Sequence, residues 1–274
     1  MQDPSPNDLD SSASRVAVEL DGVTKTYESG VMALGPLDLR VARGEFVSLL
    51  GPSGCGKSTA LRLIAGLTTP TMGQVLLAPH AGEARPSRRA INRIGFVFQE
   101  PTLMPWTRVR DNVALPLKLA GVAPAEARPQ IEAALAQVGL ADFADRYPRE
   151  LSGGMKMRVS LARALVTRPE ILLMDEPFAA LDEITRFRLN DDLLTLWRSL
   201  RMTVIFVTHS VFESVYLSQR VLVMTARPGR LSFETRIESD EPRGAAFRTS
   251  LAYAGHCRAV SEALAPAYAG ALSL

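Results

Sequence analysis

Short runs of apolar residues recur along the chain, separated by longer stretches in which apolar residues return every three or four positions. The short runs have the length of buried strands, and the spaced stretches have the period of amphipathic helices. The predicted buried strands cover residues 46–50, 94–98, 171–174, 203–207 and 220–224. The predicted helices cover residues 58–65, 155–166, 189–200 and 211–218. Strands that alternate with helices in this way predict an α/β fold, a parallel sheet covered on both faces.

A different pattern precedes the first buried strand. Residues 16–20 and 23–27 read as strands, and residues 37–41 alternate apolar and polar side chains. Alternation is typical of strands with one exposed face, so these segments predict a small antiparallel sheet beside the parallel one. Tyr27 ends the second of these strands, where it is either an ordinary strand aromatic or a ring on which a nucleotide base stacks. Residues 1–14 are rich in Pro, Ser and Asp and are expected to be disordered.

Prolines interrupt a helical pattern between residues 109 and 138. Pro116, Pro124 and Pro129 divide the segment, and proline fits best at the start of a helix. We therefore expect several short helices, inserted into the α/β core. Residues 236–274 are Ala-rich and predict a weakly helical tail.

A glycine-rich loop joins the first buried strand to the first helix. Glycines let successive backbone N–H groups turn toward one anion, and the positive end of the helix dipole points to the same place. Lys57 is expected to give a positive charge to the outer phosphates, and Ser58 to give a hydroxyl to Mg²⁺. The loop therefore predicts a nucleoside triphosphate site. Its spacing is G-x-x-x-x-G-K-S/T, in Gly51, Pro52, Ser53, Gly54, Cys55, Gly56, Lys57, Ser58 and Thr59.

Polar side chains follow three of the other predicted strands. Gln99 comes after the second buried strand, Asp175 and Glu176 after the third, and His209 just after the fourth. Ligands of open α/β sheets bind beyond the carboxyl ends of the strands, so these side chains are expected to meet at the phosphate loop. Each alone has a commoner reading, as a surface amide, a helix cap or a structural histidine. Their convergence with the loop predicts nucleotide hydrolysis.

The expected roles follow from the chemistry of phosphoryl transfer, in which positioning and charge neutralisation dominate. Asp175 is expected to hold Mg²⁺ through its water shell, and Glu176 to polarise the attacking water as a general base. Gln99 is expected to order that water or to complete the metal shell. His209 is expected to donate to the γ-phosphate.

A second glycine-rich helix start occurs at Leu151-Ser152-Gly153-Gly154. It is either a common helix N-cap or a second anion site, by the same dipole argument. One nucleotide does not need two such sites from one chain, whereas a head-to-tail pair of chains uses both. The second reading predicts a homodimer that sandwiches ATP between the phosphate loop of one copy and Ser152, Gly153 and Gly154 of the other.

Composition and charge narrow the class of protein. With 47% hydrophobic and 22% charged residues, the chain can bury a sizeable core. The net charge of +2 argues against a protein that coats nucleic acid. Cys55 and Cys257 form no disulfide framework, which fits a reducing compartment. No apolar run approaches the ~20 residues that span a bilayer, so any membrane role is expected to be peripheral.

Taken together, these motifs resemble the nucleotide-binding subunit of ATP-binding cassette transporters. The resemblance covers residues 15–235 and implies ATP and Mg²⁺ as ligands. It implies a P-loop NTPase (RecA-like) parallel sheet core, an antiparallel β subdomain, and an inserted helical subdomain at about residues 100–165, before the tail at 236–274. It also favours the base-stacking reading of Tyr27. The matched motifs are Walker A at 51–59, the Q-loop at Gln99, the signature at 151–155, Walker B at 171–176, the D-loop at 180–182 with Asp182, and the switch histidine His209.

Two residues depart from the family pattern. The signature usually reads L-S-G-G-Q, and here Met155 takes the fifth position; Met157 also replaces a usual glutamine. Met155 shares an apolar stripe with Val159 and Ala162, so we expect it to pack rather than to touch phosphate.

Several stretches resemble the nitrate/sulfonate/taurine importer group: residues 99–106, 111–113, 152–156 and 224–230. This resemblance implies two permease subunits, a second ATPase copy, an extracytoplasmic solute-binding protein and no nucleic acid. It places the chain at the cytoplasmic face of the inner membrane, with the segment after Gln99, including Trp106, against the permease. Trp106 has an alternative reading as a loop aromatic that covers local core. Alternatives for the whole chain are a soluble cassette ATPase in DNA repair or translation, and the ATPase of an exporter.

Overall fold

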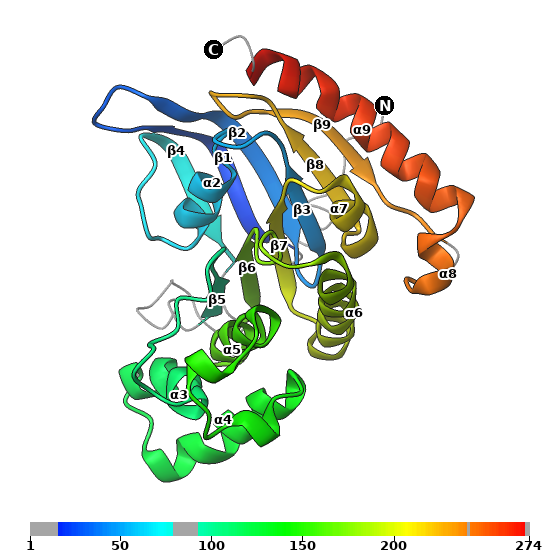
Figure 1. Ribbon diagram of the computed structural model, residues 1–274. Helices are drawn as coiled ribbons and strands as arrows, with labels where there is room; N and C mark the ends of the chain where they lie inside the picture. The colour runs from blue at the N-terminus through cyan, green and yellow to red at the C-terminus, as the bar shows by residue number, and fades with distance from the viewer. Residues whose placement is uncertain (1–15, 79–92, 240–241, 272–274) are drawn as a thin grey trace, which may run out of the picture. The chain divides into compact units, whose positions relative to one another are not determined.

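The chain folds as two compact units, one formed by residues 1–89 and 203–274 and the other by residues 90–202. The computed structural model describes residues 16–78, 93–239 and 242–271 (Figure 1). The segment at 1–14, for which disorder was expected, lies outside the described residues.

The first unit contains a small antiparallel sheet of three strands in the order β2-β1-β4. These strands are β1 (Val16–Thr26), β2 (Met32–Ala42) and β4 (Met72–Leu77). The antiparallel sheet that the sequence predicted is therefore confirmed. The prediction of two separate strands before Tyr27 is wrong, because β1 is continuous. Its register shifts between Leu20 and Val23, where Gly22 has a φ of 55° and lets the strand bend without ending.

The same unit holds a sheet in which β3 (Phe46–Leu50) lies between β7 (Thr203–Thr208) and β8 (Arg220–Met224), with both pairs parallel. Every residue of β3 and β7 is buried, as continuous apolar runs predict. A further strand, β9 (Leu231–Arg236), pairs antiparallel with β8, so the sheet is not purely parallel.

Helices of the first unit pack on these sheets (Figure 1). Helix α2 (Lys57–Ile64) contacts β2, β4 and β7, and therefore touches strands of both sheets. Helices α7 (Val211–Leu217) and α9 (Leu251–Ala271) both contact β8, and α8 (Ala245–Arg248) precedes α9. The segment expected to be weakly helical thus contains a helix of 21 residues. Its Val260 and Leu264 are buried, so packing supplies what weak local propensity lacks.

The second unit has two parallel strands, β5 (Ile94–Val97) and β6 (Ile171–Asp175), with Arg93 and Glu170 paired at 2.6 Å just before them. Its helices are α3 (Val109–Leu119), α4 (Pro124–Gln137), α5 (Gly153–Leu165) and α6 (Glu183–Leu200), with short 3-10 turns at Ala141–Phe143 and Pro148–Glu150. Pro124 begins α4 as predicted, whereas Pro116 lies inside α3 and Pro129 inside α4.

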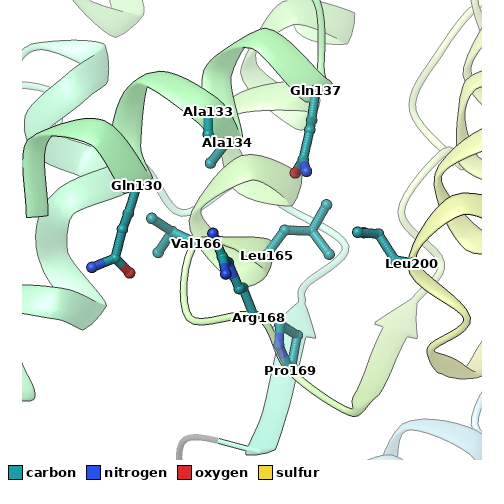
Figure 2. Close-up of a pocket in the computed structure, with 9 residues that line it drawn as sticks. All are labelled: Gln130, Ala133, Ala134, Gln137, Leu165, Val166, Arg168, Pro169 and Leu200. Carbon is teal, nitrogen blue, oxygen red and sulfur yellow. The ribbon is translucent and has the colours of Figure 1, made fainter.

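A pocket of about 360 Å³ opens in the second unit at the end of α5 (Figure 2). Amides of Gln130 and Gln137 and the guanidinium of Arg168 surround an apolar floor that includes Leu165. The start of α5, where Ser152 lies, is about 20 Å away along the helix. The pocket therefore does not belong to the predicted nucleotide site. Among the helices of the described residues, none combines the length and apolar character needed to cross a membrane.

Candidate nucleotide site

The phosphate loop lies between the buried strand β3 and helix α2 in the first unit. Gly56 caps α2 with a φ of 107°, a conformation that side chains rarely tolerate, and a Cβ there would lie 2.6 Å from the Ala33 carbonyl oxygen. At Gly51 a Cβ would lie 3.0 Å from the Met224 carbonyl oxygen. The close approach of neighbouring backbone therefore requires glycine at Gly56 and leaves little room for a side chain at Gly51.

The loop fits a polyphosphate in its charge and in its hydrogen bonds. Lys57 is 4% exposed, and its ammonium group donates to the carbonyl oxygens of Gly51 at 2.8 Å and Pro52 at 2.9 Å. The first turn of α2 contains no acidic residue, and no side chain caps it. Backbone N–H groups at a helix start without a side-chain cap are suited to an anion. The strand, loop and helix follow one another as the sequence predicted for residues 46–65, and phosphate binding by residues 51–59 stays a prediction.

Tyr27 follows β1 and is 39% exposed. Its hydroxyl lies 3.2 Å from the hydroxyl of Thr59 in the first turn of α2, and the Lys25 ammonium lies 5.5 Å from its ring centre. The ring is therefore tied to the helix that follows the phosphate loop, while part of it stays open to solvent. This placement suits a stacking surface for a base, and the role remains a prediction.

His209 follows β7 and is exposed. Strands β7 and β3 are parallel neighbours in which Thr208 pairs with Leu50, so His209 and the phosphate loop leave the sheet at the same edge. Beside His209, the Thr208 hydroxyl donates to Glu213 at 2.6 Å, and Ser210 caps α7 by accepting from the Glu213 backbone at 3.3 Å. These bonds fix the backbone on both sides of the histidine.

Gln99, Asp175 and Glu176 lie at or just after the ends of neighbouring strands, at one edge of the second unit. Val97 pairs with Met174 in the parallel β5–β6 ladder, so the segments that follow both strands emerge together. Asp175 is 8% exposed at the end of β6, whereas Gln99 is exposed. Glu176 has a φ of 46°, a left-handed backbone that costs free energy for a residue other than glycine. Such conformations cluster at functional sites.

The Ser-Gly-Gly segment begins α5 as predicted. The Ser152 hydroxyl accepts a hydrogen bond from the Met155 backbone at 3.3 Å, so the N-cap reading holds. A Cβ at Gly154 would lie 2.8 Å from the Thr185 methyl group of α6. The glycine therefore has a packing reason, which is that it lets α5 begin close to α6.

Asp182 lies beside this segment as the N-cap of α6 and accepts from the Thr185 backbone at 2.9 Å. Hydrogen bonds from the Thr185 hydroxyl, and then from its backbone N–H, lower the pKa of the Asp182 carboxyl. The structure thus places Asp182 and Gly154 against the same residue, Thr185.

The two methionines of the signature differ in burial. Met157 is 4% exposed and lies in the core, and Met155 is half-buried on the same helix as the fully buried Val159. Trp106 is 74% exposed, so its alternative reading as a cover for local core is wrong.

One group of residues that touches the phosphate loop could not be located from the sequence. Arg227, in the turn between β8 and β9, donates to the Gly54 carbonyl oxygen at 3.2 Å, and Gly229 lies against the backbone of Cys55. The stretch 224–230 was recognised as a family motif, but its spacing does not show that it reaches a loop 173 residues earlier.

The site residues therefore form two groups. The first unit holds the phosphate loop, Tyr27 and His209, and the second unit holds Gln99, Asp175 and Glu176 at one edge. The second unit also holds the starts of α5 and α6, with Ser152 and Asp182.

Comparison with known proteins agrees with these observations. The family model described as ABC transporter matches residues 34–179. The chain is 46% identical to the aliphatic sulfonates import ATP-binding protein SsuB 1 of Xanthomonas axonopodis pv. citri, over 77% of this chain and 82% of that protein. It is 44% identical to the nitrate import ATP-binding protein NrtD of Synechocystis, over 80% of both chains. The predicted resemblance to this importer group is confirmed.

A solved structure shows the same fold. The ATP-binding cassette MJ0796, in a dimeric post-hydrolysis state bound to ADP and phosphate, superposes with a TM-score of 0.70 at 34% identity. The match covers 81% of this chain and 99% of that one, which confirms the predicted α/β P-loop fold. Together with the relatives, it shows that the protein belongs to the ABC transporter family, as one of its ATP-binding subunits, which are ATPases coupled to transport.

Proposed function

We propose that this chain powers an importer for a small anionic solute, of the nitrate or sulfonate class. The carrying observation is the pair of import ATP-binding relatives, each matched over more than three quarters of this chain. The exposed Trp106, after Gln99 in the second unit, supports a docking surface for permease subunits. The importer consists of two copies of this chain, two permease subunits and an extracytoplasmic solute-binding protein. The chain binds the cytoplasmic face of the membrane through the permeases.

The phosphate loop binds the triphosphate of ATP. Lys57 neutralises the outer phosphates, and the uncapped N–H groups at the start of α2 hold their oxygens. Tyr27 stacks on the base. Ser58 and Asp175 would supply oxygen donors to Mg²⁺, a hard cation that would neutralise charge on the phosphates.

Hydrolysis relies on side chains at the strand ends. Glu176 accepts a proton from the attacking water at its carboxylate, and Gln99 orients that water. His209 donates a hydrogen bond to the γ-phosphate as charge develops on it. Ser152, Gly153, Gly154 and Asp182 of the second copy close the site. Each round of binding and hydrolysis then closes and opens the dimer.

Uptake by cells tests this function. A strain lacking the chain is expected to lose uptake of labelled nitrate or of a labelled alkanesulfonate, and wild-type protein should restore it. The Glu176→Gln variant should not restore it, because it lacks the general base. The proposal fails if uptake of both solutes persists without the chain, or if Glu176→Gln restores transport fully.

A further inference from the structure

We propose that Arg227 is a positioning residue for the phosphate loop, which it holds from outside in the shape that binds a triphosphate. The proposal rests on ATP binding by the loop. It adds to that function a role for the turn between β8 and β9, at residues 225–230.

The loop has backbone carbonyl groups as well as N–H groups. When successive N–H groups turn inward on an anion, the carbonyl oxygens of the same stretch turn away and need donors of their own. Lys57, itself at the end of the loop, donates to the oxygens of Gly51 and Pro52. The Gly54 oxygen receives its bonds from Arg227, through Nη2 at 3.2 Å and Nε at 3.4 Å. A charged guanidinium thus holds the tip of the loop by a forked contact.

The backbone of the same turn supports the loop from the side. A Cβ at Gly229 would lie 2.0 Å from the Cys55 carbonyl oxygen, closer than any side chain tolerates. Met224, at the end of β8, also lies close to the start of the loop, because its carbonyl oxygen is 3.0 Å from where a Gly51 Cβ would be. Backbone therefore meets backbone over much of the loop, and Arg227 adds a directed bond at its tip.

Hydrogen bonds hold the turn at residues 225–230 in place. The Thr225 hydroxyl donates to the Pro228 carbonyl at 3.0 Å and accepts from the Arg230 backbone at 3.1 Å. Arg230 donates from Nε to the Gly35 carbonyl of β2 at 2.7 Å, and the Gly229 backbone donates to Ala33 at 3.0 Å. The turn is therefore pinned to β2.

Strand β2 also approaches the loop directly, since a Gly56 Cβ would lie 2.6 Å from the Ala33 oxygen. The loop lies between β2 and the turn at residues 225–230, and these two segments are hydrogen-bonded to each other. Its shape is thus set before a nucleotide arrives, and binding does not have to include the entropy cost of ordering it. A loop that loses Arg227 must order its tip on binding.

The predicted consequence is a change in affinity with little change in turnover. The loop holds the phosphates both before and during hydrolysis, so weaker binding raises KM and leaves kcat nearly unchanged. We expect Arg227→Ala to raise the Kd for a fluorescent ATP analogue, and the KM for ATP, about five- to tenfold. A fold-change of this size corresponds to the loss of one charge-assisted hydrogen bond, whose strength is reduced by its exposure to solvent. Amide hydrogen exchange at residues 53–56 should speed up in this variant.

Three variants of the full-length chain complete the test. Arg227→Lys keeps a cationic donor and should restore most of the affinity, and Arg227→Gln should be intermediate. Arg236→Ala removes a positive charge from exposed β9 and should bind as wild type. The inference is overturned if Arg227→Ala binds within twofold of wild type, or if Arg227→Lys binds as weakly as Arg227→Ala. Wild-type protein that fails to bind the analogue would instead overturn the nucleotide site itself.

Discussion

Two helices of this chain begin at glycine-rich turns, and the two starts differ in the hydrogen bonds and packing contacts that they already make. At α2 the N-cap is Gly56, no side chain caps the first turn, and the buried Lys57 ammonium lies over the loop. At α5 the Ser152 hydroxyl accepts from the Met155 backbone, and Gly154 packs against Thr185.

This difference distinguishes the helix start that we propose to hold the phosphates from the one that we propose to close the site. A helix start without a side-chain cap, next to a buried cation, suits phosphate. The start of α5 has its hydroxyl in a cap and its glycine in a packing contact. We therefore expect it to add contacts only where another chain presents a bound phosphate. A glycine-rich helix start alone is therefore not evidence of an independent anion site. The hydrogen bonds that its residues already make must be counted as well.

The largest expected effect comes from Glu176→Gln. Loss of the general base should lower kcat about a thousandfold and leave ATP binding intact, because the phosphate loop is unchanged. The variant should accumulate as an ATP-bound dimer in size-exclusion chromatography, with the α5 starts engaged. Turnover near the wild-type rate would contradict the role of Glu176.

The second-largest expected effect is on ATP binding, and it differs between two lysines, one near each helix start. Lys57→Ala removes the buried charge at α2 and should weaken ATP binding about a hundredfold, measured by calorimetry. Lys156→Ala, in the first turns of α5, is the matched control and should leave ATP binding to the monomer unchanged. Equal losses in the two variants would show that both starts bind nucleotide within one chain.

The Ser152→Arg variant should have a smaller effect than Lys57→Ala, and this effect should be specific to turnover. A long cation at the start of α5 should block closure of the dimer and lower turnover about tenfold or more, without weakening ATP binding to the monomer. Ser152→Thr keeps the capping hydroxyl and is the control. Loss of monomer binding together with turnover would refute a site shared between two chains.

The smallest expected effect is a pH dependence of stability at α6, the helix against which α5 begins. The pKa of Asp182 is lowered in the fold by its hydrogen bonds from Thr185. Its cap therefore stabilises the fold above the unfolded pKa of about 4, and that stability is lost as pH falls through the folded pKa. Asp182→Asn caps without titrating, so its Tm should fall less than that of wild type between about pH 5 and pH 3.

Sequence reasoning worked best where one local pattern decides the structure. Continuous apolar runs identified β3 and β7, and the Ser-Gly-Gly order identified the start of α5 at Gly153. It failed where long-range packing decides. Strand β9 alternates half-buried and exposed residues, and it is defined by its pairing with β8 rather than by an apolar run.

The candidate site shows the same limit. The motif residues could be located because their spacing is local, as with Lys57 after Gly56. The contact of Arg227 with Gly54 could not be predicted, because it depends on how a turn folds back across the sheet. Pro116 inside α3 was missed because a buried helix face, with Val113 and Leu117, outweighs the local preference of proline for a helix start.

The backbone of Glu176 has a consequence for how this protein can be improved. Arg201 also has a left-handed backbone, but there the conformation ends α6 and its N–H bonds to the Trp197 carbonyl. Glu176 follows a strand and has no such helix end to explain it, so the chain accepts about 1 kcal/mol of conformational cost at the predicted general base. Selection for thermal stability alone should therefore favour glycine at this position. The most stable descendants of this chain would bind ATP and transport nothing.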